Sequence, residues 1–274
     1  MLNLGKTNLL PVSRIDADVY VDGGELGEIV LQEGRVENFN LGDKVSAFVF
    51  IDGHGLAQAT LRQPKAQAGE VAWLKALSVG HAGAFMDWGL PKDLLVPFSE
   101  QNERMLSGRY YLVYLFLDES NRIAASAHLE DFIQEQAFYV KAGQPVDLII
   151  AGKTDLGYKA VADNKFWGLL YANEVFRPLA AGDRLPGFIK AVRPDQKVDL
   201  CLSLTPYPQK IDDAGQKILA ALEKNGGFLA VTDHSDPQTI YAWFGVSKKV
   251  FKQSIGGLYK QRKIIIEPEG LRLP

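Results

Sequence analysis

The chain has 274 residues, 47% hydrophobic and 23% charged, which indicates several small folded domains and excludes a disordered chain. No apolar run is long enough to span a bilayer and the start lacks a signal-peptide pattern, so we expect a cytoplasmic protein with no membrane partner. The single cysteine, Cys201, excludes an internal disulfide, and its apolar surroundings predict a buried side chain.

The formal net charge of −3 is unevenly distributed along the chain. Residues 1–140 carry 11 Lys and Arg against 19 Asp and Glu, whereas residues 141–207 carry 9 against 7 and residues 208–274 carry 10 against 7. A polyanion should therefore be repelled by the N-terminal half and tolerated by the C-terminal half.

The same order of glycines and apolar runs occurs three times before residue 208. Each copy opens with a glycine before a β-like run and has a second glycine 37 or 39 residues later; the pairs are Gly5 and Gly42, Gly69 and Gly108, and Gly143 and Gly182. An apolar stretch, an Asp-containing turn and a short last strand follow in every copy. The matched spacing predicts an internal repeat.

Short apolar runs separated by turn residues fill each copy. In the second copy they predict five strands, over residues 71–77, 84–87, 94–97, 110–117 and 123–126. Five such strands in about 65 residues fit a five-stranded Greek-key barrel of the OB type. Another all-β topology with Gly-bounded strands is the alternative.

The pattern changes at residue 208. Asp212 or Asp213 can cap a helix that ends near residue 224, before two glycines. Ser235-Asp236-Pro237 predicts the start of a second helix that ends near Gly245, and Ser247 predicts the cap of a third. A strand pair over residues 264–267 and 271–273 follows. Three helices and a terminal hairpin indicate a winged helix.

Two segments carry a family resemblance. The run GAFMDWGLPKDLLVPFSEQ at residues 83–101 and the run SKKVFKQSIGGLYK at residues 247–260 closely resemble the bacterial conserved virulence factor B family. The resemblance implies a mainly β protein with three tandem S1-type OB-fold barrels and an α+β winged-helix domain. With the repeat, it predicts barrels at residues 1–65, 66–140 and 141–207 and a winged helix at 208–274. It also implies RNA binding and a regulatory role.

Single-stranded RNA is held by aromatic rings that stack on bases and by cations that follow the backbone. S1 domains resemble one another in an exposed aromatic residue on the second strand, which predicts Phe85 in the second copy and Tyr20 in the first. In the third copy the corresponding position is Lys159, beside Tyr158, which favours a phosphate contact there. The third copy interleaves rings and cations, and we predict RNA contacts at Tyr158, Lys159, Lys165, Tyr171, Lys190 and Arg193.

The third helix of the winged-helix segment should have a basic face. Lys249, Lys252 and Lys260 recur at helical spacing opposite the apolar stripe, and Arg262 and Lys263 follow at the wing. An ordinary solvated lysine face is the alternative. The pair Gly256-Gly257 should weaken this helix, which a close backbone approach by RNA or by the third barrel would explain.

Signals for catalysis are weak. Gly53-His54-Gly55 lies in a predicted turn and does not complete a dinucleotide fingerprint, and no phosphate-loop motif or His-Glu-x-x-His motif occurs. Asp16, Asp18 and Asp22 lack the Gly and terminal Glu of a calcium loop. We therefore expect a non-enzymatic protein without a cofactor or metal.

The sequence favours a regulator that binds single-stranded RNA mainly through the third barrel and the winged helix. Two alternatives stay open. One is a transcription regulator that binds DNA through the winged helix; the other is a scaffold associated with the ribosome or with RNA-processing machinery or a nuclease.

Overall fold

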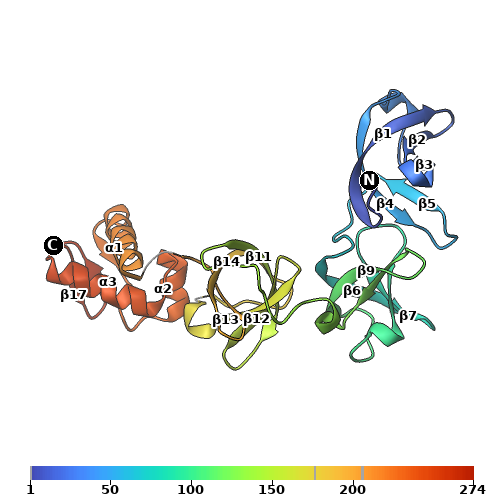
Figure 1. Cartoon of the computed structure of the whole chain (residues 1–274). Coiled ribbons are helices and arrows are strands. Elements are labelled where there is room, and N and C mark those ends of the chain that lie inside the picture. The colour runs from blue at the N-terminus through green and yellow to red at the C-terminus, as the bar shows by residue number, and fades with distance from the viewer. Residues whose placement is uncertain (1, 176, 205–206) are drawn as a thin grey trace.

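The computed structural model describes residues 2–175, 177–204 and 207–274. Three β-barrels and a small helical domain follow one another in chain order, with the first barrel and the helical domain at opposite ends (Figure 1). This arrangement confirms the predicted fold class. No helix among the described residues is long and apolar enough to cross a membrane.

The first barrel is closed, in the strand order β1-β2-β3-β5-β4. Its strands are β1 (Lys6–Ile15), β2 (Val19–Asp22), β3 (Glu28–Gln32), β4 (Lys44–Ile51) and β5 (Ala57–Thr60). Alternate residues of β1, such as Leu10 and Val12, are buried while their neighbours are exposed, as expected for a strand with one face on a core.

The second unit has five strands in the order β10-β9-β6-β7-β8, and its edge strands β8 and β10 lie against each other. The strands are β6 (Val71–Val79), β7 (Gly83–Asp87), β8 (Leu94–Pro97), β9 (Tyr110–Leu117) and β10 (Ile123–Ser126). The five strands that the sequence predicts here are all present. In the core, the rings of Trp88 and Phe48 meet edge to face at 5.8 Å, which joins the first two barrels.

The third barrel is closed in the same order as the first, β11-β12-β13-β15-β14. Its strands are β11 (Pro145–Lys153), β12 (Gly157–Ala162), β13 (Phe166–Tyr171), β14 (Arg184–Val192) and β15 (Val198–Cys201). Cys201 is buried as predicted, and this burial raises the pKa of its thiol.

The repeated glycines have one structural role. All six adopt positive φ, between 69° and 90°, which only glycine accepts without strain. In each barrel their N–H groups donate to the strand pair formed by the first and fourth strands, as in Gly143 to Ile189 and Gly182 to Ile150. The repeat in the sequence therefore marks the two ends of one strand pair.

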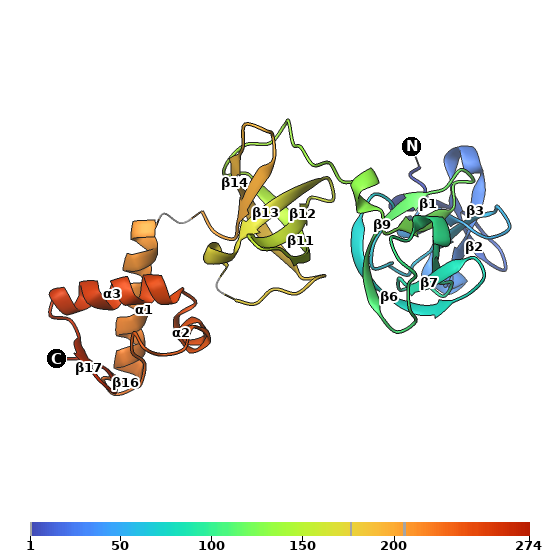
Figure 2. The same ribbon diagram turned by 90° about the horizontal axis from the view of Figure 1, so that it is seen from below.

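The C-terminal domain has the winged-helix order. Its elements are α1 (Tyr207–Lys224), β16 (Phe228–Leu229), α2 (Pro237–Phe244), α3 (Lys248–Lys260), β17 (Ile265–Glu267) and β18 (Gly270–Arg272). Asp236 and Ser247 cap α2 and α3 as predicted, and α3 crosses α1 (Figure 2).

This domain differs from the sequence-based expectation in two places. Helix α1 begins at Tyr207 rather than at Asp212 or Asp213, because Pro208 is compatible with the first turn of a helix and so does not delay its start. The sequence also did not predict β16, a strand of two residues that pairs with β18. So short a strand has no periodicity to detect.

The second and third barrels are joined by direct contacts. The Val71 N–H donates to Asn164 Oδ1 at 2.9 Å, and the Val71 carbonyl accepts from Arg184 at 2.5 Å. Around them a buried apolar cluster includes Trp167 of β13 and Ile133 of the linker. The linker between these barrels therefore packs against the third barrel.

Candidate nucleic-acid interface

The three barrels can be compared at one strand position. Tyr20, Phe85 and Lys159 each lie on the second strand of a barrel and pair with a first-strand residue, Arg14, Ser78 and Gly152 respectively, just after a register shift. Lys159 therefore occupies the position in the third barrel that Phe85 occupies in the second. In OB folds this second and third strand face, with two adjoining loops, binds oligonucleotides.

Two residues before this position, the second and third barrels have Gly83 and Gly157, at φ +150° and +155°. A Cβ at Gly157 would lie 2.0 Å from the Leu170 carbonyl oxygen, and one at Gly83 would lie 2.1 Å from that of Val96. Only glycine fits this close approach. The first barrel has an exposed Asp18 there, so its second strand begins differently.

In the first barrel the predicted ring is already covered. The Arg14 guanidinium lies 3.6 Å from the centroid of the Tyr20 ring and pairs with Glu28 at 2.8 Å and with Asp16. The hydrogen bond from Arg14 holds the pKa of the Glu28 carboxyl below its usual range, so this carboxylate is charged at neutral pH. A base that stacks on this face of Tyr20 must displace the Arg14 guanidinium. The base and its phosphate would then lie near the carboxylates of Asp16 and Glu28.

In the second barrel, Phe85 is half-buried on β7 and pairs with Leu95 of β8. No aromatic or cation–ring contact is found for Phe85 among the described residues, although Arg104 lies 3.9 Å from the nearby Phe98 ring. The Phe85 ring is therefore partly accessible, but acidic residues outnumber basic residues in the second barrel.

In the third barrel the corresponding face forms a pocket of about 360 Å³. Lys159 of β12 lines it with Trp167 of β13, Arg193 and Lys197 of the β14–β15 loop, and Glu135 of the preceding linker. The remaining lining residues come from the β11–β12 loop and from β13 and β15: Thr154, Asp155, Leu156, Gly168, Leu169 and Val198. The pocket therefore combines the strand face and both loops with which OB folds bind oligonucleotides.

Glu135 links two of the lysines in this pocket. Its carboxylate lies 3.2 Å from Lys159 Nζ through Oε1 and 3.3 Å from Lys197 Nζ through Oε2. Partial burial acts to raise the pKa of Glu135, but the hydrogen bonds and charges of the two lysines outweigh it and hold the pKa below its usual value. At neutral pH the three groups form a lysine–carboxylate–lysine row.

The Trp167 ring contacts Lys159, the first member of this row. Lys159 Nζ lies 3.9 Å from the centroid of its ring, a cation–π contact. Trp167 is 8% exposed, and its Nε1 is buried without a hydrogen-bond partner among the described atoms. The ring is thus a platform for the lysine rather than a free surface for a base.

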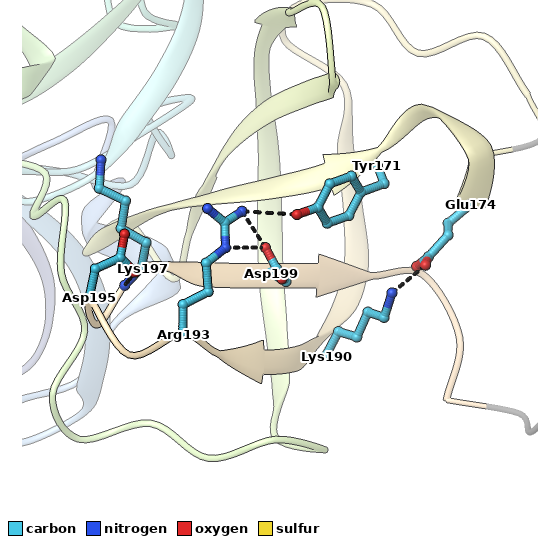
Figure 3. A network of polar contacts seen from close by, with 7 residues as sticks. All are labelled: Tyr171, Glu174, Lys190, Arg193, Asp195, Lys197 and Asp199. Carbon is cyan, nitrogen blue, oxygen red and sulfur yellow. Dashed lines mark hydrogen bonds and ion pairs between the residues drawn. The ribbon is translucent and has the colours of Figure 1, made fainter.

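A second polar cluster shares Arg193 with the pocket and continues toward Tyr171 and Lys190 (Figure 3). The Arg193 guanidinium donates to Asp199, at 2.8 Å from Nε, and to the Tyr171 hydroxyl at 3.2 Å. Lys190 pairs with Glu174, which raises the pKa of Lys190, and its Nζ lies 5.6 Å from the centroid of the Tyr171 ring. The structure therefore brings Tyr171, Lys190 and Arg193 together, with carboxylates as their partners.

Two other predicted residues of this barrel lie elsewhere. Lys165 is exposed in the β12–β13 turn, at the opposite end of β13 from Tyr171 and next to the Gln134 contact of the linker. Tyr158 packs against the barrel core and lines a separate pocket of about 270 Å³ with Pro237, Ser247 and Lys248 of the winged helix. Tyr158 and Lys159 do not share a cluster because neighbouring strand residues point to opposite faces, and Lys165 lies apart from both in the turn.

The winged helix presents the predicted cations to solvent. Lys249, Lys252 and Lys260 are exposed on α3, and Arg262 and Lys263 are exposed in the turn before β17. Lys252 pairs with Asp233 at 3.1 Å. Apart from the adjacent residues and the backbone of α3 itself, no described atom lies within 4 Å of a Cβ built at Gly256 or Gly257. The third barrel therefore does not approach this part of α3, and that explanation of the glycines is wrong.

Sequence reasoning missed Glu135, Trp167 and Lys197. Glu135 lies before the third barrel and was counted with the acidic half, and nothing in its neighbours marks it as part of a site. Trp167 is buried beside Phe166 on β13, and an apolar run of this kind does not show which ring lies under a surface cation. Among the described residues, no group of three or more His, Cys, Asp and Glu side chains is placed to hold a metal ion.

Comparison with known proteins agrees with this architecture. The family model of the S1 domain matches residues 4–62, and that of the CvfB-like winged helix domain matches residues 216–273. The chain is therefore a multidomain protein whose S1-type barrels precede a winged helix, a class that points to nucleic-acid-binding regulators.

Three curated relatives match almost the whole chain. Proteins named Conserved virulence factor B from Staphylococcus saprophyticus, Staphylococcus epidermidis and Staphylococcus aureus are 25%, 26% and 26% identical to it, and each match covers 96% of this chain and 92% of the relative. The resemblance to the conserved virulence factor B family is therefore confirmed. A solved multidomain protein with nucleic acid binding domains from Streptococcus pneumoniae is 26% identical, covering 99% of this chain and 98% of that one, at a TM-score of 0.41.

Proposed function

We propose that this chain is a cytoplasmic regulatory protein that binds single-stranded RNA mainly through its third barrel and its winged helix. The observation that carries the proposal is the pocket on the β12–β13 face, where Lys159, Arg193 and Lys197 converge. This is the face that OB folds use for oligonucleotides, and cations at it can follow a phosphate backbone.

The carboxylates beside these cations do not prevent RNA binding. The Lys159 and Lys197 pairs with Glu135 are about half exposed, and exposed ion pairs contribute only about 0–1 kcal/mol each. Phosphates can therefore replace a carboxylate at small cost. On α3, the exposed Lys249, Lys252 and Lys260 supply further cations.

The test compares the two halves of the molecule by fluorescence anisotropy with a labelled single-stranded RNA at several salt concentrations. Each lysine that contacts a phosphate should lower the slope of log affinity against log salt by about 0.7 when it is changed to Ala. We expect this loss, summed over two lysines, for the double variant Lys249→Ala, Lys252→Ala, and a lower affinity for Lys159→Ala.

Lys44→Ala, an exposed lysine of the first barrel, is the matched control and should bind as the unmodified chain does. Unchanged binding by the Lys249→Ala, Lys252→Ala variant, together with lost binding by Phe85→Ala, would show that the second barrel is the main site instead.

DNA binding by the winged helix is the second candidate, favoured by the cations on α3, the helix that follows α2 in helix-turn-helix order. Competition of duplex DNA against single-stranded RNA separates the two, since RNA should win under our proposal. A scaffold role with the ribosome or RNA-processing machinery would instead show weak binding to free RNA and co-sedimentation with the partner.

A further inference from the structure

The polar row in the third-barrel pocket has a defined order of hydrogen-bonding groups. Lys159 is a donor, the Glu135 carboxylate is an acceptor, and Lys197 is a second donor. We propose that this pocket selects uracil among the RNA bases and that Glu135 is the residue that determines the specificity. The inference rests on the proposed RNA-binding function and names the base that the pocket takes.

The pairing edge of uracil is complementary to this row. It presents a carbonyl oxygen, the N3–H donor and a second carbonyl oxygen, and proteins read single-stranded bases on such edges. Cytosine and adenine place an unprotonated ring nitrogen where uracil has N3–H, so two acceptors would face each other at the Glu135 carboxylate. Guanine keeps a ring N–H, but its amino group would face a lysine, donor against donor.

The pocket has room and a suitable surface for a base. Its volume is about 360 Å³, and its apolar walls include Leu156, Leu169 and Val198. The side chains of Lys159, Lys197 and Glu135 are 44%, 49% and 51% exposed, so a ligand can reach all three. Since Lys159 already covers the Trp167 ring, the base would be read mainly through its edge.

The backbone holds Glu135 in place from both sides. On one side, the Gln134 N–H donates to the Lys165 carbonyl and the Trp167 N–H donates to the Gln134 carbonyl, both at 2.9 Å. On the other side, the Ala137 N–H donates to the Gln196 carbonyl at 3.0 Å. A linker residue is thereby fixed on the barrel face, as a group that discriminates between bases must be.

The first barrel has no such row at the corresponding position, because Arg14 pairs with Asp16 and Glu28 and covers Tyr20. Loss of selectivity in a Glu135 variant would therefore assign the selectivity of the full chain to the third barrel.

The experiment measures the affinity of the full chain for four ten-residue RNAs: oligo-U, oligo-C, oligo-A and an oligo-U whose bases carry a methyl group on N3. We expect the affinity for oligo-U to be at least about fivefold higher than the affinity for oligo-C or oligo-A. This ratio is at the lower end of the discrimination between bases that a well-placed pair of hydrogen bonds supplies. N3-methylation removes the donor that faces Glu135 and should abolish this preference.

Glu135→Gln removes the charged acceptor and should bring the ratio of oligo-U to oligo-C affinity close to one, while oligo-C affinity holds or rises because a negative charge has gone. Glu130→Gln, in the same linker but outside the pocket, is the matched control and should keep the ratio. Equal affinity of the unmodified chain for oligo-U and its N3-methylated form, or an unchanged ratio in Glu135→Gln, would overturn the inference. If none of the RNAs binds, the proposed function itself has failed.

Discussion

The first and third barrels have the same strand order, but the corresponding position on the second strand is a ring, Tyr20, in the first and a cation, Lys159, in the third. In the first, Arg14 covers the Tyr20 ring and is paired with Asp16 and Glu28. In the third, Lys159 covers the Trp167 ring and shares Glu135 with Lys197 at the edge of a pocket. The comparison teaches that an aromatic residue at the S1 position is not enough for base stacking, because a neighbouring cation can occupy the ring first.

The largest expected effect concerns the glycine that begins the second strand. Gly157→Ala should lower the free energy of unfolding of the third barrel by about 3 kcal/mol, because its Cβ would lie 2.0 Å from the Leu170 carbonyl oxygen at positive φ. Thermal denaturation followed by circular dichroism measures the loss. Asp18→Ala, at the corresponding position of the first barrel, should change stability by less than about 1 kcal/mol. Similar melting of the two variants would mean that the two strands begin alike.

A smaller effect, on RNA affinity, is expected when the Tyr20 ring of the first barrel is uncovered. The triple variant Arg14→Ala, Asp16→Asn, Glu28→Gln uncovers Tyr20 and removes two negative charges. One stacked base contributes about 1–3 kcal/mol, so RNA affinity should rise about fivefold. Anisotropy titration of the full chain checks this. Arg14→Ala alone should give less, since both carboxylates remain. An equal gain in the single variant would show that these two carboxylates do not weaken RNA binding at Tyr20.

The smallest effect is the pH dependence of the Glu135 pairs. The pKa of Glu135 is lowered in the folded chain, so its contribution to stability is present above the pKa of the unfolded chain and is lost as pH falls through the folded value. The difference in melting temperature between the unmodified chain and Glu135→Gln should therefore be constant near neutral pH and disappear in acid. A difference that instead grows on acidification would show that folding raises the pKa of Glu135 rather than lowering it.

Much of the fold could be predicted from local signals. Glycines at positive φ recur at fixed spacing and mark the ends of one strand pair in every barrel, and capping residues such as Asp236 and Ser247 mark the helix starts. Such features depend on a few neighbouring residues, so they can be read without knowing what lies across the barrel. The start of α1 was missed because Pro208 and the two aspartates are all compatible with a first turn.

Three barrels, a winged helix and the correspondence of Lys159 with Phe85 follow from the amino-acid sequence, because strand alternation and turn geometry are local properties of the chain. Which rings are free, which cations are paired and which residues share a pocket depends on the tertiary structure. Arg14 reaches Tyr20 across a strand pair, and Glu135 reaches Lys159 and Lys197 from a separate linker. These contacts depend on side-chain direction and on strands brought together by barrel closure, which residue spacing along the chain does not encode.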